Sequence, residues 1–237
     1  SLLGFYRAYY IHTLSPLDKI LEFILQVKPT FIASYPSTLL ELTNTYGERL
    51  KKIKGIKAIC TNSEHSSQQQ RDFIGNVFHC QTYDEYSTEE LSKCAFQCAY
   101  KAYHLQEDCA YVEILNDKNN NEVTGSNIGE IVGTSLHNYV MPFIRYRQGD
   151  LGTIKPSHCR CKMNMRLLIN LSGRKNHSFK LNSGKQIPSG KILDWTYKLF
   201  LTHNMDIIQF QVVQHTVANV EVIIQPGSKY QTTIHDN

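Results

Sequence analysis

Apolar runs of helical period and of strand-like period alternate along the first 81 residues. Between residues 17 and 26, Ile20, Leu21 and Ile24 recur at the spacing that places side chains on one face of a helix. Strands that are joined through helices run parallel, so this alternation predicts an α/β domain with a parallel sheet. The other expected helices are 38–46, with Ser37 as N-cap, and 66–74, and the expected strands are 30–33, 56–60 and 77–81.

The pattern of apolar residues changes after residue 105. Short strand-like runs follow one another, which is typical of an antiparallel sheet or a distorted barrel. Beyond residue 173, a helical run and two strand-like runs predict a small α+β module. We therefore expect an α/β fold with a parallel sheet, an antiparallel barrel-like subdomain and a small α+β lid, divided between residues 1–172 and 173–237. The expected elements are strands 110–115, 130–135, 142–147, 151–155, 207–213 and 217–225 and helix 188–200.

Composition and charge argue against several classes of protein. The chain is 41% hydrophobic, enough for a packed core, and its net charge is +4. The lysine-rich run 51–57 is best explained as a solvated edge between a helix and a strand, not as the basic stripe of a nucleic-acid binder. No run approaches the ~18 apolar residues of a membrane span, and no secretion signal opens the sequence. We expect a cytoplasmic protein that binds neither membranes nor nucleic acid.

One polar constellation follows an apolar run near residue 140. Arg145, Arg147 and Asp150 lie close together in the sequence, and Gly149 allows a sharp turn. An aspartate on such a turn can accept two hydrogen bonds from a ribose diol, and arginines suit a phosphate or carboxylate. The alternative is a surface Arg–Asp pair at a hairpin.

A second polar segment, residues 84–90, follows a predicted strand. Tyr86 can stack on a base, the hydroxyls of Ser87 and Thr88 can bond phosphate, and a carboxylate such as Glu90 can hold magnesium. The alternative is the acidic first turn of a helix that begins near Thr88.

The cysteines form a third constellation. Their number, seven, is odd, which disfavours a disulfide framework and leaves metal ligation open. Cys98 lies close to His104, and Cys159 and Cys161 form a C-x-C pair; three thiolates and an imidazole suit a tetrahedral structural zinc. Free cysteines in a cytoplasmic chain are also typical small core residues. Further candidate ligands are His158, Cys94 and Cys109.

The order of these motifs is more specific than any one of them. The run 129–150 resembles the GEIV-T-L-N-MP-IRYR-GD signature of the phenylacetate–coenzyme A ligase group of adenylate-forming enzymes, which includes capsular-polysaccharide-associated homologues. The resemblance covers about residues 17–225 and makes 1–172 the second half of the AMP-binding, adenylating domain and 173–237 the start of the C-terminal lid. Other motifs in the family's order are Tyr-Pro-Ser at 35–37, Thr-Asn-Ser-Glu at 61–64, the segment 86–90, the Cys/His spacing and Gly-Arg at 173–174.

The resemblance implies a two-step reaction. A small carboxylic acid attacks the α-phosphate of ATP and gives an acyl-adenylate and pyrophosphate. Coenzyme A, or another nucleophile, then displaces AMP. Magnesium and cationic groups offset the charge that builds on the α-phosphate.

The resemblance also assigns roles to single residues. Asn62, Ser63 and Glu64 would line the adenine pocket, and Tyr86 would stack on adenine. Glu90 would hold magnesium, Asp150 would hold the ribose hydroxyls, and Arg174 would reach the ribose or phosphate. Asn176 would be the hinge, and the structural zinc would be bound by Cys98, His104, Cys159 and Cys161.

The sequence departs from the family pattern at three positions. Glu89 stands where a hydroxyl is usual and would repel a phosphate, Asn176 replaces the usual hinge aspartate, and Lys162 follows Cys161 where glycine is usual.

The family's phosphate loop is expected before residue 1 and its catalytic lysine after residue 237. We therefore expect the isolated chain to be inactive alone, and a homodimer or a complementing N-terminal segment is compatible with the resemblance. Alternatives are a nucleotide- or partner-binding module without catalysis and a zinc-stabilised scaffold.

Overall fold

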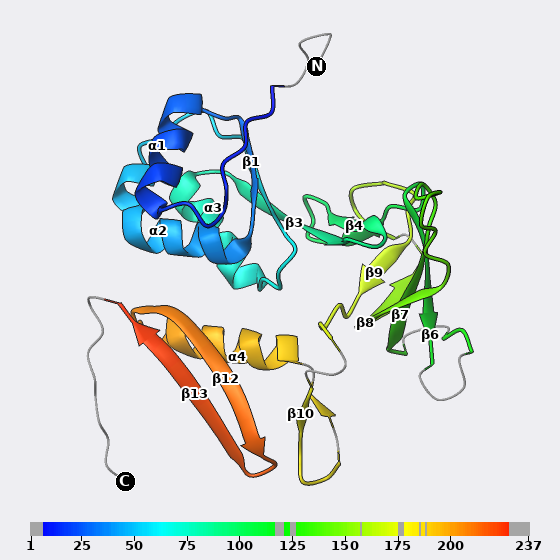
Figure 1. The fold of residues 1–237 in the computed structure, drawn as a ribbon. Helices are drawn as coiled ribbons and strands as arrows, with labels where there is room; N and C mark the ends of the chain where they lie inside the picture. Colours follow the sequence, from blue (N-terminus) through cyan, green and yellow to red (C-terminus); the bar gives the residue numbers. More distant parts are fainter. Residues whose placement is uncertain are drawn as a thin grey trace. The chain divides into compact units, whose positions relative to one another are not determined.

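Two compact units, Ser1–Asp84 and Glu85–Asn237, make up the chain, and each contains its own apolar core (Figure 1). The computed structural model describes residues 7–116, 121–123, 127–156, 158–174, 178–184, 186–187 and 189–227. The division that the sequence suggested, between residues 1–172 and 173–237, stays a prediction.

The first unit alternates helices and strands, as the sequence predicted. Strands β1 and β2 pair in parallel, in register from Phe31 opposite Ala58 to Ser34 opposite Thr61, and β3 lies next to β2. The parallel α/β sheet is therefore confirmed. The elements are α1 (Leu17–Val27), β1 (Phe31–Ser34), α2 (Pro36–Leu50), β2 (Ala58–Asn62), α3 (Gln68–Phe78) and the first half of β3 (Gln81–Thr88).

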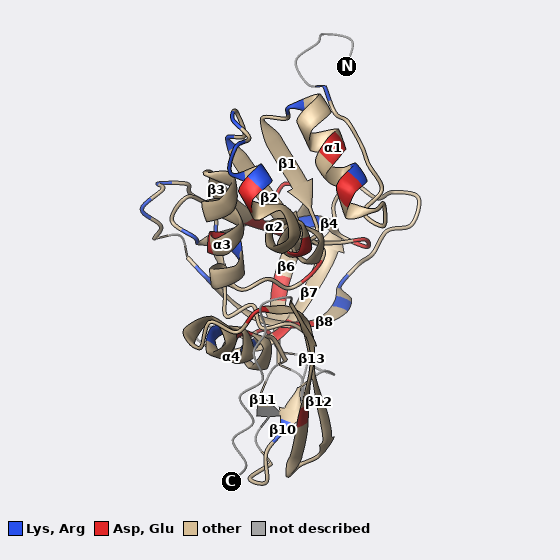
Figure 2. Ribbon diagram, turned by 90° about the vertical axis from the view of Figure 1, so that its left-hand side faces the viewer, with Lys and Arg blue, Asp and Glu red and all other residues tan. Residues whose placement is uncertain are grey.

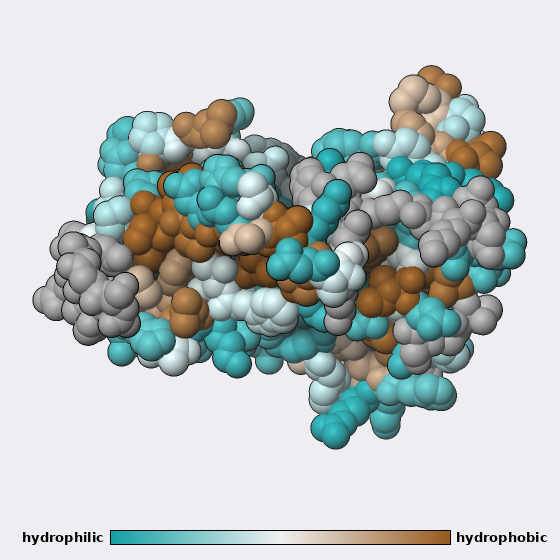
Figure 3. Space-filling model, turned by 90° about the horizontal axis from the view of Figure 1, so that it is seen from below, coloured by the Kyte–Doolittle hydropathy of each residue, from teal (hydrophilic) through white to brown (hydrophobic). Residues whose placement is uncertain are grey.

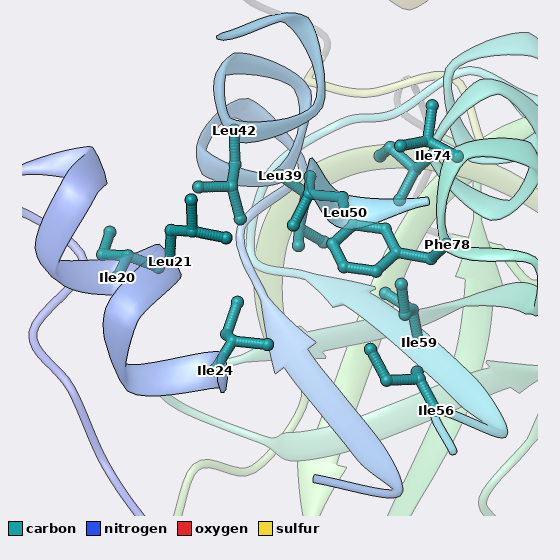
Figure 4. Packing of buried hydrophobic residues seen from close by; sticks show 11 residues of the cluster. Ile20, Leu21, Ile24, Leu39, Leu42, Leu50, Ile56, Ile59, Ile74 and Phe78 are labelled. Carbon is teal, nitrogen blue, oxygen red and sulfur yellow. The ribbon is translucent and has the colours of Figure 1, made fainter. Parts of the chain in front are cut away.

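One aliphatic cluster holds the first unit together. All three helices bury side chains in it, and Figure 4 shows Phe78 of α3 next to Ile59 of β2 and Leu21 of α1 next to Leu42 of α2. Burying a large apolar side chain contributes about 1.5–3 kcal/mol, so this cluster is the main source of stability in the unit. Its buried members are Ile20, Leu21, Ile24, Leu39, Leu42, Leu50, Ile56, Ile59, Ile74, Val77 and Phe78.

Two boundaries in this unit differ from the sequence prediction. Ser37 was expected to cap α2, but the helix begins at Pro36 and Tyr35 is the N-cap residue, without a side-chain hydrogen bond. The strand expected over 77–81 was also wrong, because α3 continues to Phe78 and ends at His79 in the left-handed conformation. Both of the last two helical residues are buried in the aliphatic cluster, so packing extends the helix past the predicted end.

Antiparallel strands dominate the second unit, which confirms the predicted change of architecture. Their order is β3-β4-β5-β9-β8-β7-β6. The helix considered near Thr88 is absent: β3 turns directly into β4 and pairs with it. The strand expected over 142–147 begins only at Tyr146, where it continues as one long strand. The strands are β4 (Ser92–Gln97), β5 (Tyr103–Leu105), β6 (Ala110–Leu115), β7 (Gly129–Ser135), β8 (Tyr146–Lys155) and β9 (Leu167–Ile169).

The end of the chain forms the predicted small α+β module. Helix α4 packs on β12 through Phe200, whose ring meets Phe210 edge-on at 5.1 Å. Apolar side chains stay exposed here, among them Trp195, and Figure 3 shows apolar areas among polar ones on the face seen from below. The elements are β10 (Phe179–Lys180), β11 (Gln186–Ile187), α4 (Ser189–Thr202), β12 (Ile207–Thr216) and β13 (Asn219–Pro226); the short β10 and β11 were not predicted.

Charged residues of both signs are interspersed on the surface. Figure 2 shows blue and red segments side by side on α1, where Lys19 and Glu22 form an ion pair of 2.9 Å. Among the described residues, none of the helices has the length and apolar character that a membrane crossing requires.

Candidate functional site

A bulge in β8 sets the position of Asp150. The ladder between β7 and β8 loses its register between Glu130 and Val132, so that residues 148–150 bulge out of the ladder. Gly149 has a φ of 79°, which glycine adopts without strain. The expected turn after a strand is therefore a bulge inside one strand, because pairing with β7 resumes after it. Bulges of this kind change the direction of a side chain.

Tyr86 and Asp150 lie together, as the motif order suggested. The Tyr86 hydroxyl donates to Asp150 Oδ2 at 2.8 Å, and Gln148 Oε1 lies 3.0 Å from the same hydroxyl. Burial, followed by the nearby Asp150 charge, raises the pKa of Tyr86 well above its usual value, so the phenol stays protonated. Burial also raises the pKa of Asp150, against the hydrogen bond from Tyr86 and the charge of Arg174. The two predicted segments thus share one site.

A second tyrosine–carboxylate contact lies beside the first. Glu90 sits on the turn between β3 and β4, and the Tyr146 hydroxyl donates to its Oε1 at 2.8 Å. This hydrogen bond is the main cause that lowers the pKa of Glu90, while Glu90 raises the pKa of Tyr146. Glu89, which stands where the family usually has a hydroxyl, is exposed. Tyr146 lies inside the motif run but was not singled out, because only the tertiary structure shows which carboxylate its hydroxyl meets.

Arg174 enters the same site from the next segment of the chain. Its backbone forms an isolated antiparallel bridge with Asp150, and the Gly173 carbonyl accepts a hydrogen bond from Leu151 N at 3.2 Å. The guanidinium charge opposes the burial that raises the pKa of Asp150, and it adds to the Tyr146 hydrogen bond that lowers the pKa of Glu90. The predicted hinge residue, Asn176, lies outside the described residues.

Three other predicted phosphate ligands make contacts of their own. Arg147 forms an ion pair with Glu130, and its Nε donates to Glu130 Oε2 at 3.1 Å. The Thr88 hydroxyl oxygen accepts a hydrogen bond from Leu91 N at 3.1 Å and thereby helps to hold the β3–β4 turn, and Ser87 pairs with Lys93 across the hairpin. The roles of Arg147, Ser87 and Thr88 at a phosphate stay predictions.

The predicted adenine segment belongs to the first unit. It follows the carboxyl end of β2, where parallel sheets commonly bind ligands. Ser63 adopts a left-handed φ of 64°, and its Oγ donates to Asn62 Oδ1 at 3.1 Å. Glu64 Oε2 accepts a hydrogen bond from Ser37 N at the start of α2, at 3.2 Å. Because the segment and Tyr86 lie in different units, a shared adenine pocket stays a prediction.

Four predicted metal ligands converge within the second unit. The ligand atoms of Cys98, His104, Cys159 and Cys161 all lie within 4.8 Å of one another. Cys98 Sγ and Cys159 Sγ are 3.6 Å apart, and Cys161 Sγ and His104 Nε2 are 3.2 Å apart. A tetrahedral zinc with Zn–S bonds of about 2.3 Å places its sulfurs about 3.8 Å apart, so the spacing fits the ion.

The surroundings of His104 also test whether the four residues can hold a zinc ion. The residue is fully buried on β5, and its ring stacks on Phe96 at a centroid distance of 6.0 Å. Its Nε2 faces Cys161, which leaves Nδ1 buried and without a hydrogen-bond partner among the described residues. Metal-bound histidines usually donate this second N–H to an acceptor, so the site has the ligands of a zinc centre but lacks this supporting contact in the part described.

Solved structures of similar fold are adenylate-forming ligases. The chain aligns with 2-hydroxyisobutyryl-CoA ligase in the postadenylation state in complex with 2-HIB-AMP, at a TM-score of 0.78 and 19% identity over 90% of this chain and 46% of that one. It aligns with an anthranilate CoA ligase in complex with anthranoyl-AMP at a TM-score of 0.65 and 11% identity, over 92% and 43% of the two chains. The adenylation domain of a carboxylate reductase from Mycobacterium chelonae gives 0.64 and 14%, over 90% and 37%.

The chain has the fold of part of these solved ligases. It spans less than half the length of the solved ligases that it matches. No family model matches the sequence, and no curated protein matches it either. The evidence for the fold is therefore structural.

Proposed function

We propose that this chain is part of an adenylate-forming ligase of the phenylacetate–coenzyme A ligase type. Such an enzyme activates a carboxylic acid with ATP and transfers the acyl group to coenzyme A or another nucleophile. One observation carries the proposal: on a ligase fold, the Tyr86 segment and the Asp150 bulge meet, with Glu90 and Arg174 beside them.

Each side chain would have a defined task in the first step. An oxygen of the acid attacks the α-phosphorus of ATP, and the bond to pyrophosphate breaks. Asp150 would accept hydrogen bonds from the ribose hydroxyls, and Tyr86 would lie against the base. Glu90 would hold magnesium, which offsets charge on the phosphates, and Arg174 would add a positive charge there. In the second step the thiol of coenzyme A attacks the acyl carbon and AMP leaves.

The Cys/His cluster would bind a structural zinc ion. Its four ligands come from the end of β4, from β5 and from the segment before β9, so the ion would join three parts of the strand region. A site closed by four protein ligands has no open position for a substrate, which favours a structural over a catalytic metal.

The experiment that tests the nucleotide site is calorimetric titration of the chain with AMP. Wild type should bind AMP, and Asp150→Ala should weaken binding by about 1.5–3 kcal/mol, because hydrogen bonds to a charged group are lost. Asp108→Ala, an exposed aspartate of the same unit, is the matched control. Absence of AMP binding by wild type, also in its longer sequence context, would contradict the proposal.

A second candidate function is a nucleotide- or partner-binding module that does not catalyse the reaction. Glu89, which stands at the family's hydroxyl position, favours it because a carboxylate repels phosphate. We expect residues 1–237 alone not to form thioesters. Carboxylate-dependent pyrophosphate release by the protein in its longer context would favour the ligase, and AMP binding without any release across aryl and fatty acids would favour the module.

A further inference from the structure

Two hydrogen bonds of opposite direction connect the β3–β4 hairpin with β8. Tyr86 on β3 donates to Asp150 on β8, and Tyr146 on β8 donates to Glu90 on the hairpin turn; both distances are 2.8 Å. Each element therefore contributes one tyrosine and one carboxylate. The pair of contacts is reciprocal, and it fixes the turn against the strand at two points.

Each hydrogen bond uses a single oxygen of its carboxylate, Oδ2 of Asp150 and Oε1 of Glu90. An ionised carboxylate offers about four lone-pair sites on two oxygens, so each group keeps acceptor capacity for a second partner. A neutral phenol that donates to one oxygen leaves the carboxylate charged. Burial and the Asp150 charge raise the pKa of Tyr86, and the hydrogen bond to Glu90 with its charge raises the pKa of Tyr146, so both phenols remain donors at neutral pH.

Packing holds the donor Tyr146 and the turn in place. The Tyr146 ring meets the Phe143 ring edge-on at 5.1 Å, and Tyr146 lies opposite Gly133 in the β7–β8 ladder. Leu91, the residue after Glu90, is fully buried against Gly133, where a Cβ atom would overlap its side chain. The turn that carries Glu90 is therefore anchored on the same stretch of sheet as the tyrosine that meets it.

We propose that Tyr86 and Tyr146 are positioning residues that orient Asp150 for ribose and Glu90 for a divalent cation; this inference rests on the proposed nucleotide site. Without the phenols, the carboxylates would sample other rotamers and would lose that freedom on binding. Tyr146 then affects the binding of the cation and not that of the nucleoside, whereas Tyr86 affects the binding of the nucleoside. This division distinguishes positioning from a general role in folding.

The test is calorimetry with AMP in the absence of magnesium and with ATP at increasing magnesium, on the full chain. Tyr146→Phe should raise the magnesium concentration for half-maximal ATP binding about three- to tenfold and leave AMP binding unchanged, because Glu90 must then lose rotamer freedom when the cation binds. Tyr86→Phe keeps the ring and should weaken AMP binding about three- to tenfold. Tyr111→Phe, a half-exposed tyrosine on β6, is the matched control.

A second variant isolates the cation effect. Glu90→Gln should remove most of the magnesium dependence, and adding Tyr146→Phe to it should cause no further change. If wild type binds AMP and both tyrosine variants behave like the control, the positioning role is wrong and the proposed function stands. Equal weakening of both ligands together with a lower melting temperature would reduce the tyrosines to structural residues and also overturn the inference. If wild type binds neither nucleotide, the proposed function fails and the inference falls with it.

Discussion

The two compact units achieve stability by different means. The first buries a single aliphatic cluster between three helices and a parallel sheet. The second consists of short antiparallel strands around a core that includes small residues such as Cys94, Ala95 and Ala110, and it adds the Cys/His cluster and the tyrosine–carboxylate contacts. Periodic apolar sequence is enough to specify a unit of the first kind. A unit of the second kind also depends on polar side chains that meet at defined distances.

Removing the proposed zinc should have the largest effect, and it should affect the two units differently. Structural zinc contributes on the order of 10 kcal/mol of apparent binding free energy in small domains. Cys98→Ser, or chelation, should therefore unfold the strand region of the second unit and leave the first unit folded, as measured by calorimetry and elemental analysis. Cys109→Ser, which changes a cysteine outside the cluster, should keep both zinc and stability. A preparation without stoichiometric zinc would contradict this part of the comparison.

Truncating a side chain of the aliphatic cluster should destabilise the first unit and leave the second unit folded. Phe78 is 2% exposed, and Phe78→Ala should lower the free energy of unfolding by about 3–5 kcal/mol, because it leaves a cavity. Chemical denaturation followed by circular dichroism measures the loss. Phe31→Ala makes the same change at a side chain that is 55% exposed and should cost far less. Equal effects of the two variants would mean that the cluster does not hold this unit together.

Gly133→Ala tests how tightly the strand region is packed around the Glu90 turn. The new Cβ would overlap Leu91, and overpacking of this kind costs about 1–3 kcal/mol. The melting temperature of the second unit should fall, and magnesium-dependent ATP binding should weaken with it. Combining Gly133→Ala with Leu91→Ala should cost less than the sum of the two single changes, since the overlap is removed. Strict additivity would show that the two residues do not interact.

The smallest expected effect is the pH dependence of AMP affinity and of stability in the second unit. Burial raises the pKa of Asp150, so its charged form is lost on acidification at a higher pH than for an exposed aspartate. AMP affinity should therefore fall as the pH falls through that raised pKa, which calorimetry at several pH values would detect. For stability the sign is reversed: the folded state holds this proton more tightly, so the contribution is full below the ordinary aspartate pKa and is lost as the pH rises through the raised one. Asp150→Asn should remove both trends.

Particular residues show how far sequence reasoning reached. Ile20, Leu21 and Ile24 recur at helical spacing, and α1 lies where that spacing placed it. The end of α3 was missed, because Val77 and Phe78 have strand-like chemistry and only their burial against the other helices keeps them helical. Asp150 and Tyr86 meet, as their assignment to one nucleotide implied. The bulge that orients Asp150 depends on the register of β8 with β7, a strand distant in sequence.

The sequence by itself determined the alternation of helices and strands, the change to antiparallel strands and the identity of the chemical groups at the candidate site, since local periodicity and residue type are properties of neighbouring residues. Tertiary structure decided which other groups meet: Tyr146 with Glu90 and Arg147 with Glu130. These contacts join positions many residues apart, and strand register and core packing fix their distances. Pairing of that kind leaves no local pattern from which it could have been read.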